Sequence, residues 1–575
     1  MKPFLTLEEV RNAIIGQNFI FQTPYGMRLL TYADYTASGR SLKFIEQFLI
    51  KIQREYANTH TEDDVTGRHM TEILHQAETI IKKAFNAEKN CRIIATGTGA
   101  TGAISKFQEI IGIHLPPATR NLVRSILDNS SEENVIDQNL RKKLELEIDR
   151  LKPVVFIGPY EHHSNDIMWR EAIAEVVTIQ LTSDGYIDLK DLESQVSDAK
   201  YKKRLKIGSF SAASNVTGLK SPVYEIARIM HKYGGLVCFD FAASAPYVKI
   251  NMNNDSDTFF DAIFISPHKF VGGPGSSGIL VFNERVYNLE LSPTSAGGGT
   301  VDFVSSTTVD YLKDIESREK SGTPGVLQTI KAALVIDLKD AIGIDNIESK
   351  ELEYTTRALE RLSKHSKIKI LGPIDPENRI SIVSFMIKQG DKYLHPKFIT
   401  KLLNDLFGIQ SRAGCMCAGP YGHSLLNINE EQSQRFRKIG QQGKLGIRPG
   451  WCRVNFHYLF SEIEFKFICQ AIEFIADYGY LFLLKYSFNI NSGVWTHLNF
   501  KDTILYNKPD IKSVLTTNLR GCFDEELIDR NVEFTKYLND ARKLVKTLGD
   551  EIEYRQFDDP EAEELRWFNF IHINK

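Results

Sequence analysis

Several features that would mark a specialised class of protein are scarce in this sequence. It has seven cysteines, so at least one cannot be paired within the chain, and at 575 residues the chain is long. That count argues against a disulfide framework and favours a reducing compartment, so we expect a cytoplasmic protein. No apolar run looks long enough to cross a bilayer, and the longest candidate, residues 480–484, is short. We therefore expect no membrane association.

The sequence also lacks a large excess of charge of either sign, and we expect no secretory signal peptide. The net charge of -3 gives no electrostatic reason to expect nucleic acid or an anionic membrane as a partner. The first residues include Glu8 and Glu9, and they lack the apolar stretch of a signal peptide.

The common metal and nucleotide motifs are absent as well. Cys415 and Cys417 form a C-x-C pair rather than the C-x-x-C of most zinc sites, and no second pair has a matching spacing. We therefore expect no metal site. Residues 97–102 lack the Gly-Lys-Ser/Thr of a Walker A loop and make a poor Rossmann fingerprint.

What is present is an alternation of short apolar runs, polar loops and amphipathic helices. Runs at 154–157, 205–210, 236–239 and 262–265 predict buried strands, each followed by a polar loop. This order is typical of an α/β fold with a mostly parallel sheet and helices on both faces. The length predicts more than one domain.

The loop after residues 262–265 contains Ser266, His268 and Lys269. At the carboxyl end of a strand, where α/β sheets bind ligands, a lysine beside phosphate donors suggests a phosphorylated aldehyde held as a Schiff base. Pyridoxal phosphate is such an aldehyde. On these residues alone, a surface lysine in a flexible turn is about as good an interpretation.

Four consecutive predicted strands end in polar groups: an imidazole, His162, an amide, Asn215, a carboxylate, Asp240, and the lysine Lys269. Pyridoxal phosphate chemistry uses these groups: a carboxylate keeps the ring nitrogen protonated, an imidazole stacks on the ring, and an amide bonds its phenolic oxygen. Separately, each could be a surface histidine, a turn former or a helix cap. Residues 93–102 add a strand, a Gly/Thr loop and a helix expected from Ala103, which suits a phosphate or forms a simple tight turn.

In these residues the chain resembles the class V aminotransferase family of pyridoxal phosphate enzymes, most closely its cysteine desulfurase/selenocysteine lyase group. The resemblance runs from about Tyr32 to about Phe474, and the order of its blocks carries it. The blocks are YADYTA at 32–37, GAT at 99–101, EHHSN at 161–165, SNVTG at 214–218, DFA at 240–242, SPHK at 266–269, GGGT at 297–300, Gly-Thr-Pro at 322–324, SRAGCMCAGP at 411–420 and CRV at 452–454.

The resemblance implies a homodimeric enzyme of the fold-type-I class, with a role for each matching residue. Lys269 would bind pyridoxal phosphate covalently and move a proton, while His162 stacks on the ring. Asp240 would pair with the ring nitrogen and Asn215 with the phenolic oxygen. The remaining roles are phosphate binding by Gly99, Ala100, Thr101, Ser266 and His268, a contribution to the neighbouring subunit's site by Thr300, and binding of the substrate carboxylate by Arg453 with Arg412 nearby.

Cys417 occupies the position at which desulfurases carry the cysteine that takes sulfur from the substrate. The resemblance therefore implies removal of sulfur from L-cysteine through a persulfide on Cys417, and a sulfur-acceptor protein as partner. Two alternatives stay open for the thiol: Cys415 could react instead, or Cys417 could be an ordinary small buried residue. For the whole chain, the alternatives are another class V reaction on a small amino acid, and an interaction protein without the cofactor.

Two departures from the family pattern bear on the assignment. Ala243 stands where the family has glutamine or histidine, and the link between Cys417 and Arg453 is expanded at 421–446. The predicted domains are an N-terminal arm, 1–31, a large cofactor-binding domain, 32–325, with a charged surface insertion at about 114–152, and a smaller α/β domain, 326–480. A C-terminal extension, 481–575, forms an extra small domain or wraps over the dimer.

Overall fold

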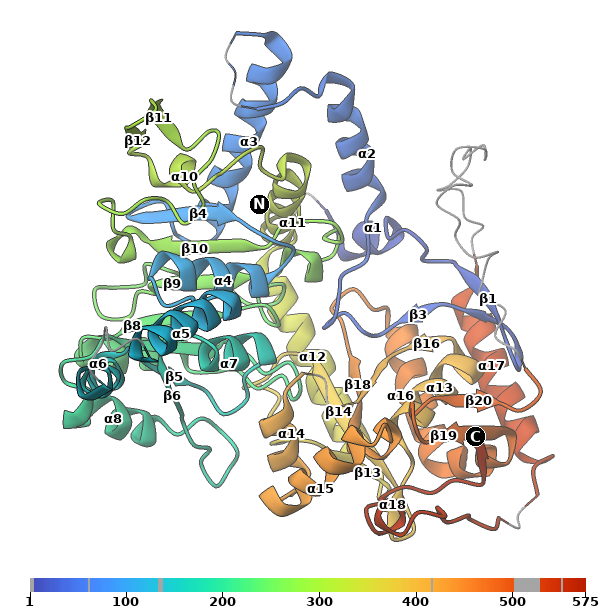
Figure 1. Ribbon diagram of the computed structural model, residues 1–575. Coiled ribbons are helices and arrows are strands. Elements are labelled where there is room, and N and C mark those ends of the chain that lie inside the picture. The colour runs from blue at the N-terminus through green and yellow to red at the C-terminus, as the bar shows by residue number, and fades with distance from the viewer. Residues whose placement is uncertain are drawn as a thin grey trace. The chain divides into compact units, whose positions relative to one another are not determined.

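The computed structural model describes residues 5–59, 61, 63–132, 138–414, 417–500, 528–549 and 552–574. It forms two compact units (Figure 1). The sheet unit comprises Ile45–Ser214 and Lys220–Ile344, and the C-terminal unit comprises Met1–Phe44, Asn215–Leu219 and Asp345–Lys575. Both units are therefore discontinuous in sequence, and the predicted domain bounds stay a prediction.

The sheet unit is built on a seven-stranded sheet of order β4-β10-β9-β8-β7-β5-β6. β10 is antiparallel to β4 and β9, and the remaining neighbours are parallel, which confirms the predicted mostly parallel sheet. The strands are β4 (Cys91–Ala95), β5 (Val154–Ile157), β6 (Glu175–Thr178), β7 (Lys206–Ser211), β8 (Leu236–Asp240), β9 (Ala262–Ile265) and β10 (Ile279–Asn283).

Burial explains why these strands read as continuous apolar runs. Every residue of β5, β9 and β10 is buried, as expected of strands covered on both faces. Helices α4 (Ala100–Ile110) and α7 (His163–Arg170) contribute Phe107 and Trp169 to one core with Phe264 of β9. α8 (Leu189–Ser197) and α9 (Val223–Lys232) complete the alternation, and α9 packs on β7 and β8.

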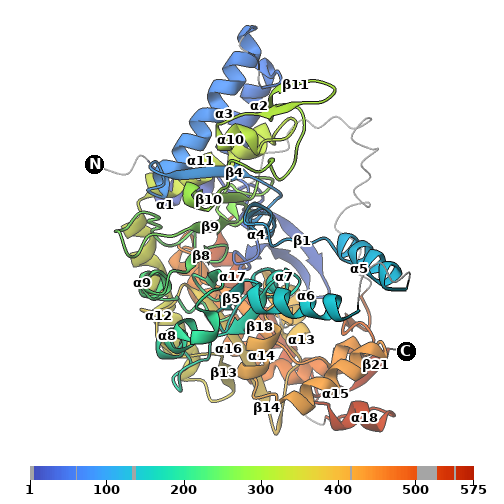
Figure 2. The same cartoon turned by 60° about the vertical axis from the view of Figure 1, so that its left-hand side comes forward.

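Two long helices, α3 (Val65–Ala84) and α11 (Val326–Ile342), lie side by side in both views (Figure 1, Figure 2). A short hairpin, β11 (Val301–Val304) with β12 (Val309–Tyr311), and α10 (Ile315–Arg318) precede α11. The insertion predicted at about 114–152 contains α5 (Pro117–Glu132) and α6 (Gln138–Leu151). Apolar side chains of both helices face solvent, including Leu122, Ile126, Leu146 and Ile148.

The C-terminal unit has an antiparallel sheet of order β13-β14-β18-β17, with β15 paired to β14. Its strands are β13 (Ile368–Ile370), β14 (Ile382–Gln389), β15 (Lys392–Tyr393), β17 (Arg412–Gly414) and β18 (Trp451–Asn455). β3 (Thr31–Tyr32) pairs in parallel with β16 (Ile409–Gln410). The helices of this unit include α12 (Ile344–Ser363), α13 (Pro396–Phe407) and α16 (Glu462–Tyr478), and α13 packs on β17, β18 and α16.

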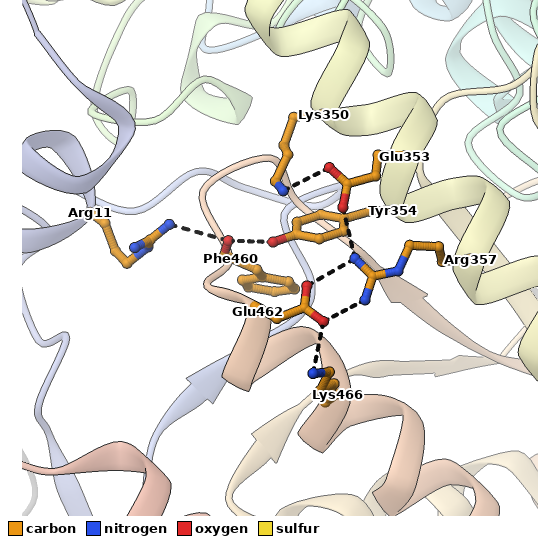
Figure 3. A network of polar contacts seen from close by, with 8 residues as sticks. All are labelled: Arg11, Lys350, Glu353, Tyr354, Arg357, Phe460, Glu462 and Lys466. Atoms are coloured by element: carbon orange, nitrogen blue, oxygen red, sulfur yellow. Dashed lines mark hydrogen bonds and ion pairs between the residues drawn. The ribbon is translucent and has the colours of Figure 1, made fainter.

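The N-terminal segment belongs to the same unit. It forms α1 (Leu7–Asn12), α2 (Lys43–Ile52, mostly in the sheet unit) and the hairpin of β1 (Ile20–Thr23) and β2 (Gly26–Leu29). The Phe460 carbonyl accepts hydrogen bonds from Arg11 of α1, at 3.2 Å, and from the Tyr354 hydroxyl of α12, at 2.8 Å (Figure 3). Arg357 of α12 forms a two-pronged ion pair with Glu462 of α16. These contacts join three helices distant in sequence.

The C-terminal extension and the segment 421–446 are also part of this unit. The extension forms α17 (Arg530–Val545), α18 (Pro560–Glu564) and a three-stranded sheet of β19 (Tyr486–Asn489), β20 (Trp495–His497) and β21 (His572–Asn574). The segment 421–446 is largely helical, with α14 (Gly419–Leu425) and α15 (Glu430–Gln441). α15 pairs with the acidic α18 through Arg435–Glu564, at 2.6 Å, and Lys438–Glu561, at 3.0 Å.

One segment, Glu462–Lys485, is by length and composition apolar enough to cross a bilayer, so the prediction that no such run exists was wrong. Its most apolar window is 67% buried inside the protein, as in the core helix of a globular protein.

Candidate active site

Lys269 follows β9 directly, in the short 3-10 turn Pro267–Lys269. Its backbone N–H donates to the Ser266 carbonyl at 3.0 Å, which fixes the turn. Gly273, four residues later, packs closely against this turn: a Cβ at that position would lie 1.9 Å from the Pro267 carbonyl oxygen. Gly273 is thus required by a close backbone approach. Lys269 itself is half-buried.

Asp240 ends β8, the parallel neighbour of β9, so both side chains leave the sheet at the same edge. The carboxylate is 5% exposed, and its Oδ1 accepts the Ala242 backbone N–H at 2.8 Å. Burial raises the pKa of Asp240, while the hydrogen bond and the positive charge of Lys269 act in the opposite direction. The structure therefore brings these two predicted residues together as a buried carboxylate facing a lysine.

The N-terminus of α4 lies against the same loop. The Ala100 backbone N–H donates to Ser266 Oγ at 2.9 Å, and the His268 Nδ1 lies 2.7 Å from the Thr98 carbonyl. A Cβ on Gly99 would come within 2.9 Å of the His268 ring, so only glycine fits. Burial and then Lys269 lower the pKa of His268, which favours its neutral form. The helix begins at Ala100, three residues before the predicted start.

His162 caps the N-terminus of α7. Its Nδ1 accepts the Ser164 backbone N–H at 3.2 Å, which places the ring proton of neutral His162 on Nε2. The Ser164 hydroxyl lies 2.7 Å from the Thr101 hydroxyl of α4. The two helix N-termini are thus linked through a serine that the sequence reasoning had not assigned.

Glu161, the residue before His162, is buried and was likewise given no role. Its carboxylate accepts hydrogen bonds from the backbone N–H groups of Gly158 and Ser211, the Ser211 hydroxyl and the Asn165 amide, at 2.6–3.1 Å. Burial raises its pKa to about 7 despite these donors. Four donors converging on one acid hold the ends of β5 and β7 and the start of α7 in place.

Thr300 is not joined to this group. Its side chain is fully buried, and its hydroxyl donates to the Gly297 carbonyl of its own loop at 2.7 Å. Its role toward a second subunit stays a prediction.

The predicted substrate residues and Asn215 belong to the C-terminal unit. Arg453 of β18 donates from Nη1 to the Asn215 carbonyl at 2.7 Å and from Nη2 to Asp34 Oδ1 at 3.0 Å. Arg412 of β17 donates from Nε to Asp34 Oδ2 at 3.0 Å. The Asp34 carboxylate thus brings both predicted arginines together. Asp34 is part of the YADYTA block, but the sequence analysis gave it no role.

Cys417 lies in a turn between β17 and α14. It is exposed, and its backbone has φ 57°, an uncommon conformation for a residue with a side chain. The described cysteines other than Cys417 are buried: Cys91, Cys238, Cys452 and Cys469. Burial raises the pKa of each of these four thiols. Cys415 lies outside the described residues, so the choice between the two thiols stays a prediction.

The donor set of the sheet unit fits pyridoxal phosphate. A helix N-terminus with the hydroxyls of Ser266 and Thr101 suits a phosphate, and a buried carboxylate beside a lysine suits the ring nitrogen and the aldehyde. Among the described residues, no group of three or more His, Cys, Asp or Glu side chains is placed to hold a metal ion.

Comparison with known families agrees with this geometry. The family model described as "Aminotransferase class-V" matches residues 134–458, more than half of the chain. The chain belongs to the aminotransferase class-V family. Enzymes of this family depend on pyridoxal phosphate, and membership makes this chain an enzyme of that kind.

Within class V, the curated relatives are named probable cysteine desulfurases. One from Halalkalibacterium halodurans is 33% identical over 270 residues, which cover 46% of this chain and 62% of the relative. One from Streptomyces coelicolor is 26% identical over 396 residues, covering 68% and 84%. One from Staphylococcus aureus is 26% identical over 414 residues, covering 71% and 88%. The chain is thus a class V enzyme similar to cysteine desulfurases.

Solved structures support the fold-type-I architecture of this class V enzyme. The apo cysteine desulfurase of Thermococcus onnurineus NA1 superposes with a TM-score of 0.62 at 21% identity, covering 83% of this chain and 100% of that one. A cysteine desulfurase of Escherichia coli gives a TM-score of 0.56 at 18% identity, covering 77% and 93%. The predicted fold class is confirmed.

Proposed function

We propose that this class V enzyme removes sulfur from L-cysteine, leaving alanine and a persulfide on Cys417. The observation that carries the proposal is the buried Asp240 carboxylate facing Lys269 at the end of two adjacent parallel strands. The relatives named cysteine desulfurases favour this reaction over the other class V chemistries.

Residues of the sheet unit would hold the cofactor. Pyridoxal phosphate, when bound, supplies a ring that accepts electrons from the substrate carbons. The Asp240 carboxylate would hold a proton on the ring nitrogen, and His162, fixed by its cap on α7, would stack on the ring. Gly99, Ala100, Thr101, Ser266 and His268 would bind the phosphate, with the dipole of α4 adding to their donors.

Lys269 would have two roles, covalent attachment of the cofactor and proton transfer at Nζ. A lysine serves as a base only when its ammonium has lost a proton. The half-buried position of Lys269, in a turn with a hydrogen bond from its backbone N–H to the Ser266 carbonyl, supports both roles.

Residues of the C-terminal unit would bind the substrate. Arg453 Nε is buried and has no hydrogen-bond partner among the described residues. An orphan guanidinium donor of this kind calls for an acceptor, and the carboxylate of a small amino acid is a suitable one. Arg412 would assist, and Asn215 would bond the phenolic oxygen of the cofactor.

Cys417 would carry out the sulfur transfer. Its Sγ attacks the sulfur of the substrate, the carbon–sulfur bond breaks, and its electron pair passes to the substrate carbon, which gains a proton. One cysteine and one enzyme thiol thus give one alanine and one enzyme persulfide, with no oxidant needed. The exposed position of Cys417 allows both this attack and delivery of the persulfide to a sulfur-acceptor protein.

We further propose a cytoplasmic homodimer with shared sites, as the resemblance implies. In the sheet unit, the hairpin β11–β12 exposes Phe303, Val304 and Val309, each 45–57% accessible. A second copy covering them would remove an apolar patch from water.

The experiment measures alanine and sulfide formed from L-cysteine by purified holoenzyme with a thiol reductant. Cys417→Ala is expected to abolish both products and to leave the visible absorbance of the cofactor intact, whereas Cys415→Ala keeps activity. If Cys417→Ala keeps full activity and Cys415→Ala loses it, the thiol is misassigned. If both variants still form alanine and sulfide, sulfur transfer through a persulfide on this loop is wrong. If wild-type holoenzyme forms neither product, the reaction is a different class V chemistry.

A further inference from the structure

Asp34 is the third member of the cluster that contains Arg412 and Arg453. Each of its two carboxylate oxygens accepts from a different arginine, Oδ1 from Arg453 and Oδ2 from Arg412, both at 3.0 Å. Asp34 is the second residue after β3, and it is more than 370 residues away in the chain from either partner. A single carboxylate therefore bridges the two predicted substrate arginines.

The backbone holds Asp34 firmly. The Ala33 N–H donates to the Gln410 carbonyl, and the Asn455 N–H donates to the Ala33 carbonyl, both at 2.9 Å. The residue before Asp34 is thus bonded both to β16 and to the end of β18. Because β17 and β18 also pair directly, opposing Arg412 to Arg453, the carboxylate and both guanidinium groups are fixed on one framework.

Two of the three side chains are largely buried and the third is exposed. The Arg453 side chain is 4% exposed and that of Asp34 is 12% exposed, whereas the Arg412 side chain is 51% exposed. Arg453 has two of its nitrogens engaged and keeps its buried Nε without a partner among the described residues. The cluster as a whole bears two positive charges and one negative charge, so a single positive charge is left for a ligand.

We propose that Asp34 is a positioning and specificity-determining residue of the substrate-carboxylate site. It aligns the two arginines and leaves their cluster a net charge that matches one carboxylate. The inference rests on the proposed function, since it assumes that Arg453 binds the substrate carboxylate, and it adds the residue that would disfavour amino acids with a second carboxylate.

Two consequences follow from the loss of the Asp34 charge. The exposed Arg412 is no longer held, so the pair loses its alignment for a single carboxylate. The cluster also gains a second net positive charge, which favours an amino acid with two carboxylates. The ratio of two dissociation constants, for an amino acid with one carboxylate and for its isostere with two, reports on both effects.

The experiment titrates holoenzyme with L-asparagine and with L-aspartate, which share a shape and differ by one negative charge, and follows the visible absorbance of the cofactor. Wild-type protein is expected to bind asparagine more tightly than aspartate. Asp34→Asn is expected to shift the ratio of the two dissociation constants about tenfold or more toward aspartate. Asp34→Glu, which keeps the charge, is expected to retain the wild-type preference for asparagine.

Glu473→Gln is the matched control, because Glu473 forms a two-pronged pair with Arg361 at 2.6 Å on α12 and α16. It removes the same charge without touching the cluster and should leave the ratio unchanged. An Asp34→Asn ratio equal to that of wild type, or a Glu473→Gln ratio shifted equally, overturns this inference alone. If wild-type holoenzyme responds to neither amino acid and forms no alanine from L-cysteine, the proposed function fails first, whereas a missing response with alanine still formed overturns this inference alone. Should Asp34→Asn not fold, an Asp34→Glu ratio shifted toward aspartate overturns the inference.

Discussion

Glu161 and Asp240 are two buried acids of the sheet unit, one in the loop after β5 and one at the end of β8, and the two are not equivalent. Asp240 has one backbone hydrogen bond and faces a lysine, as a partner for the cofactor should. Glu161 has four donors, and the negative charge of Asp240 acts to raise its pKa. We interpret Asp240 as the cofactor-facing carboxylate and Glu161 as the acid that holds its surroundings.

Titration of Glu161 predicts a pH dependence of stability. Burial raises its pKa from 4.5 to about 7. Between these values the folded state retains a proton that the unfolded state releases, so this contribution to the free energy of unfolding is present below pH 4.5 and is lost as pH rises toward 7. Between pH 4.5 and about 7, the free energy of unfolding of wild type should fall by about 3 kcal/mol relative to that of Glu161→Gln, which cannot titrate at this position.

Urea unfolding of wild type and Glu161→Gln across that pH range measures this difference. Glu88→Gln, at an exposed position, is the matched control and should track wild type at every pH. A wild-type-minus-Gln difference that does not change with pH would show that Glu161 is ionised throughout.

At the scale of elements, the C-terminal extension packs on the core of its unit through α17. The Phe534 ring stacks on Phe467 of α16 with centroids 3.9 Å apart, and both side chains are 2% exposed. The Tyr537 hydroxyl accepts the Leu29 backbone N–H of β2 at 3.0 Å. The extension is thus part of the core of the C-terminal unit.

Phe534→Ala should therefore destabilise the whole C-terminal unit, by about 3–5 kcal/mol, because it leaves a cavity against Phe467. A lower urea midpoint in the main unfolding transition, measured by far-UV circular dichroism, is the expected result. Val532→Ala on the same helix, at a position 59% exposed, should change stability by less than about 0.5 kcal/mol. A separate early transition in Phe534→Ala, with the main one unmoved, would instead make the extension an independent domain.

Local patterns predicted most elements of the sheet unit, and long-range contacts explain the differences. The apolar run 154–157 coincides with β5, because every residue in it is buried. The start of α4 was placed at Ala103 because the glycines before it read as loop. It begins at Ala100, whose N–H donates to Ser266 Oγ, 166 residues away in the chain. The local hydrophobic pattern cannot predict a contact over that separation.

The candidate site shows the same division. Lys269 and Asp240 could be predicted because strand ends of one sheet edge are readable from sequence. Asp34 could not, since its role depends on arginines 378 and 419 residues further along the chain. Thr300 matched the family block, yet its hydroxyl bonds to its own loop, a local geometry that a motif does not specify.

At the scale of the whole molecule, self-association is the property most open to test. Phe303→Glu places a charge on the exposed hairpin β11–β12, at a side chain 55% accessible in the single chain. If this hairpin is covered in the dimer, the variant should dissociate at protein concentrations at which wild type is dimeric, measured by light scattering after gel filtration.

Val65→Glu supplies the comparison for the hairpin variant, because it also charges an exposed apolar position, 74% accessible, but on α3. The hairpin assignment predicts that Phe303→Glu weakens the dimer more than Val65→Glu does. Equal masses for Phe303→Glu and wild type at every concentration would place the subunit contact elsewhere.

The central claim is that Lys269 is the residue to which the cofactor is covalently attached. Reducing the holoenzyme with borohydride, digesting it and sequencing the labelled peptide by mass spectrometry tests this most directly. We predict a pyridoxyl group on Lys269, in the peptide that follows β9, and none in a Lys269→Ala protein treated in the same way. A label on a different lysine, or no label on protein that retains its absorbance, would contradict the account.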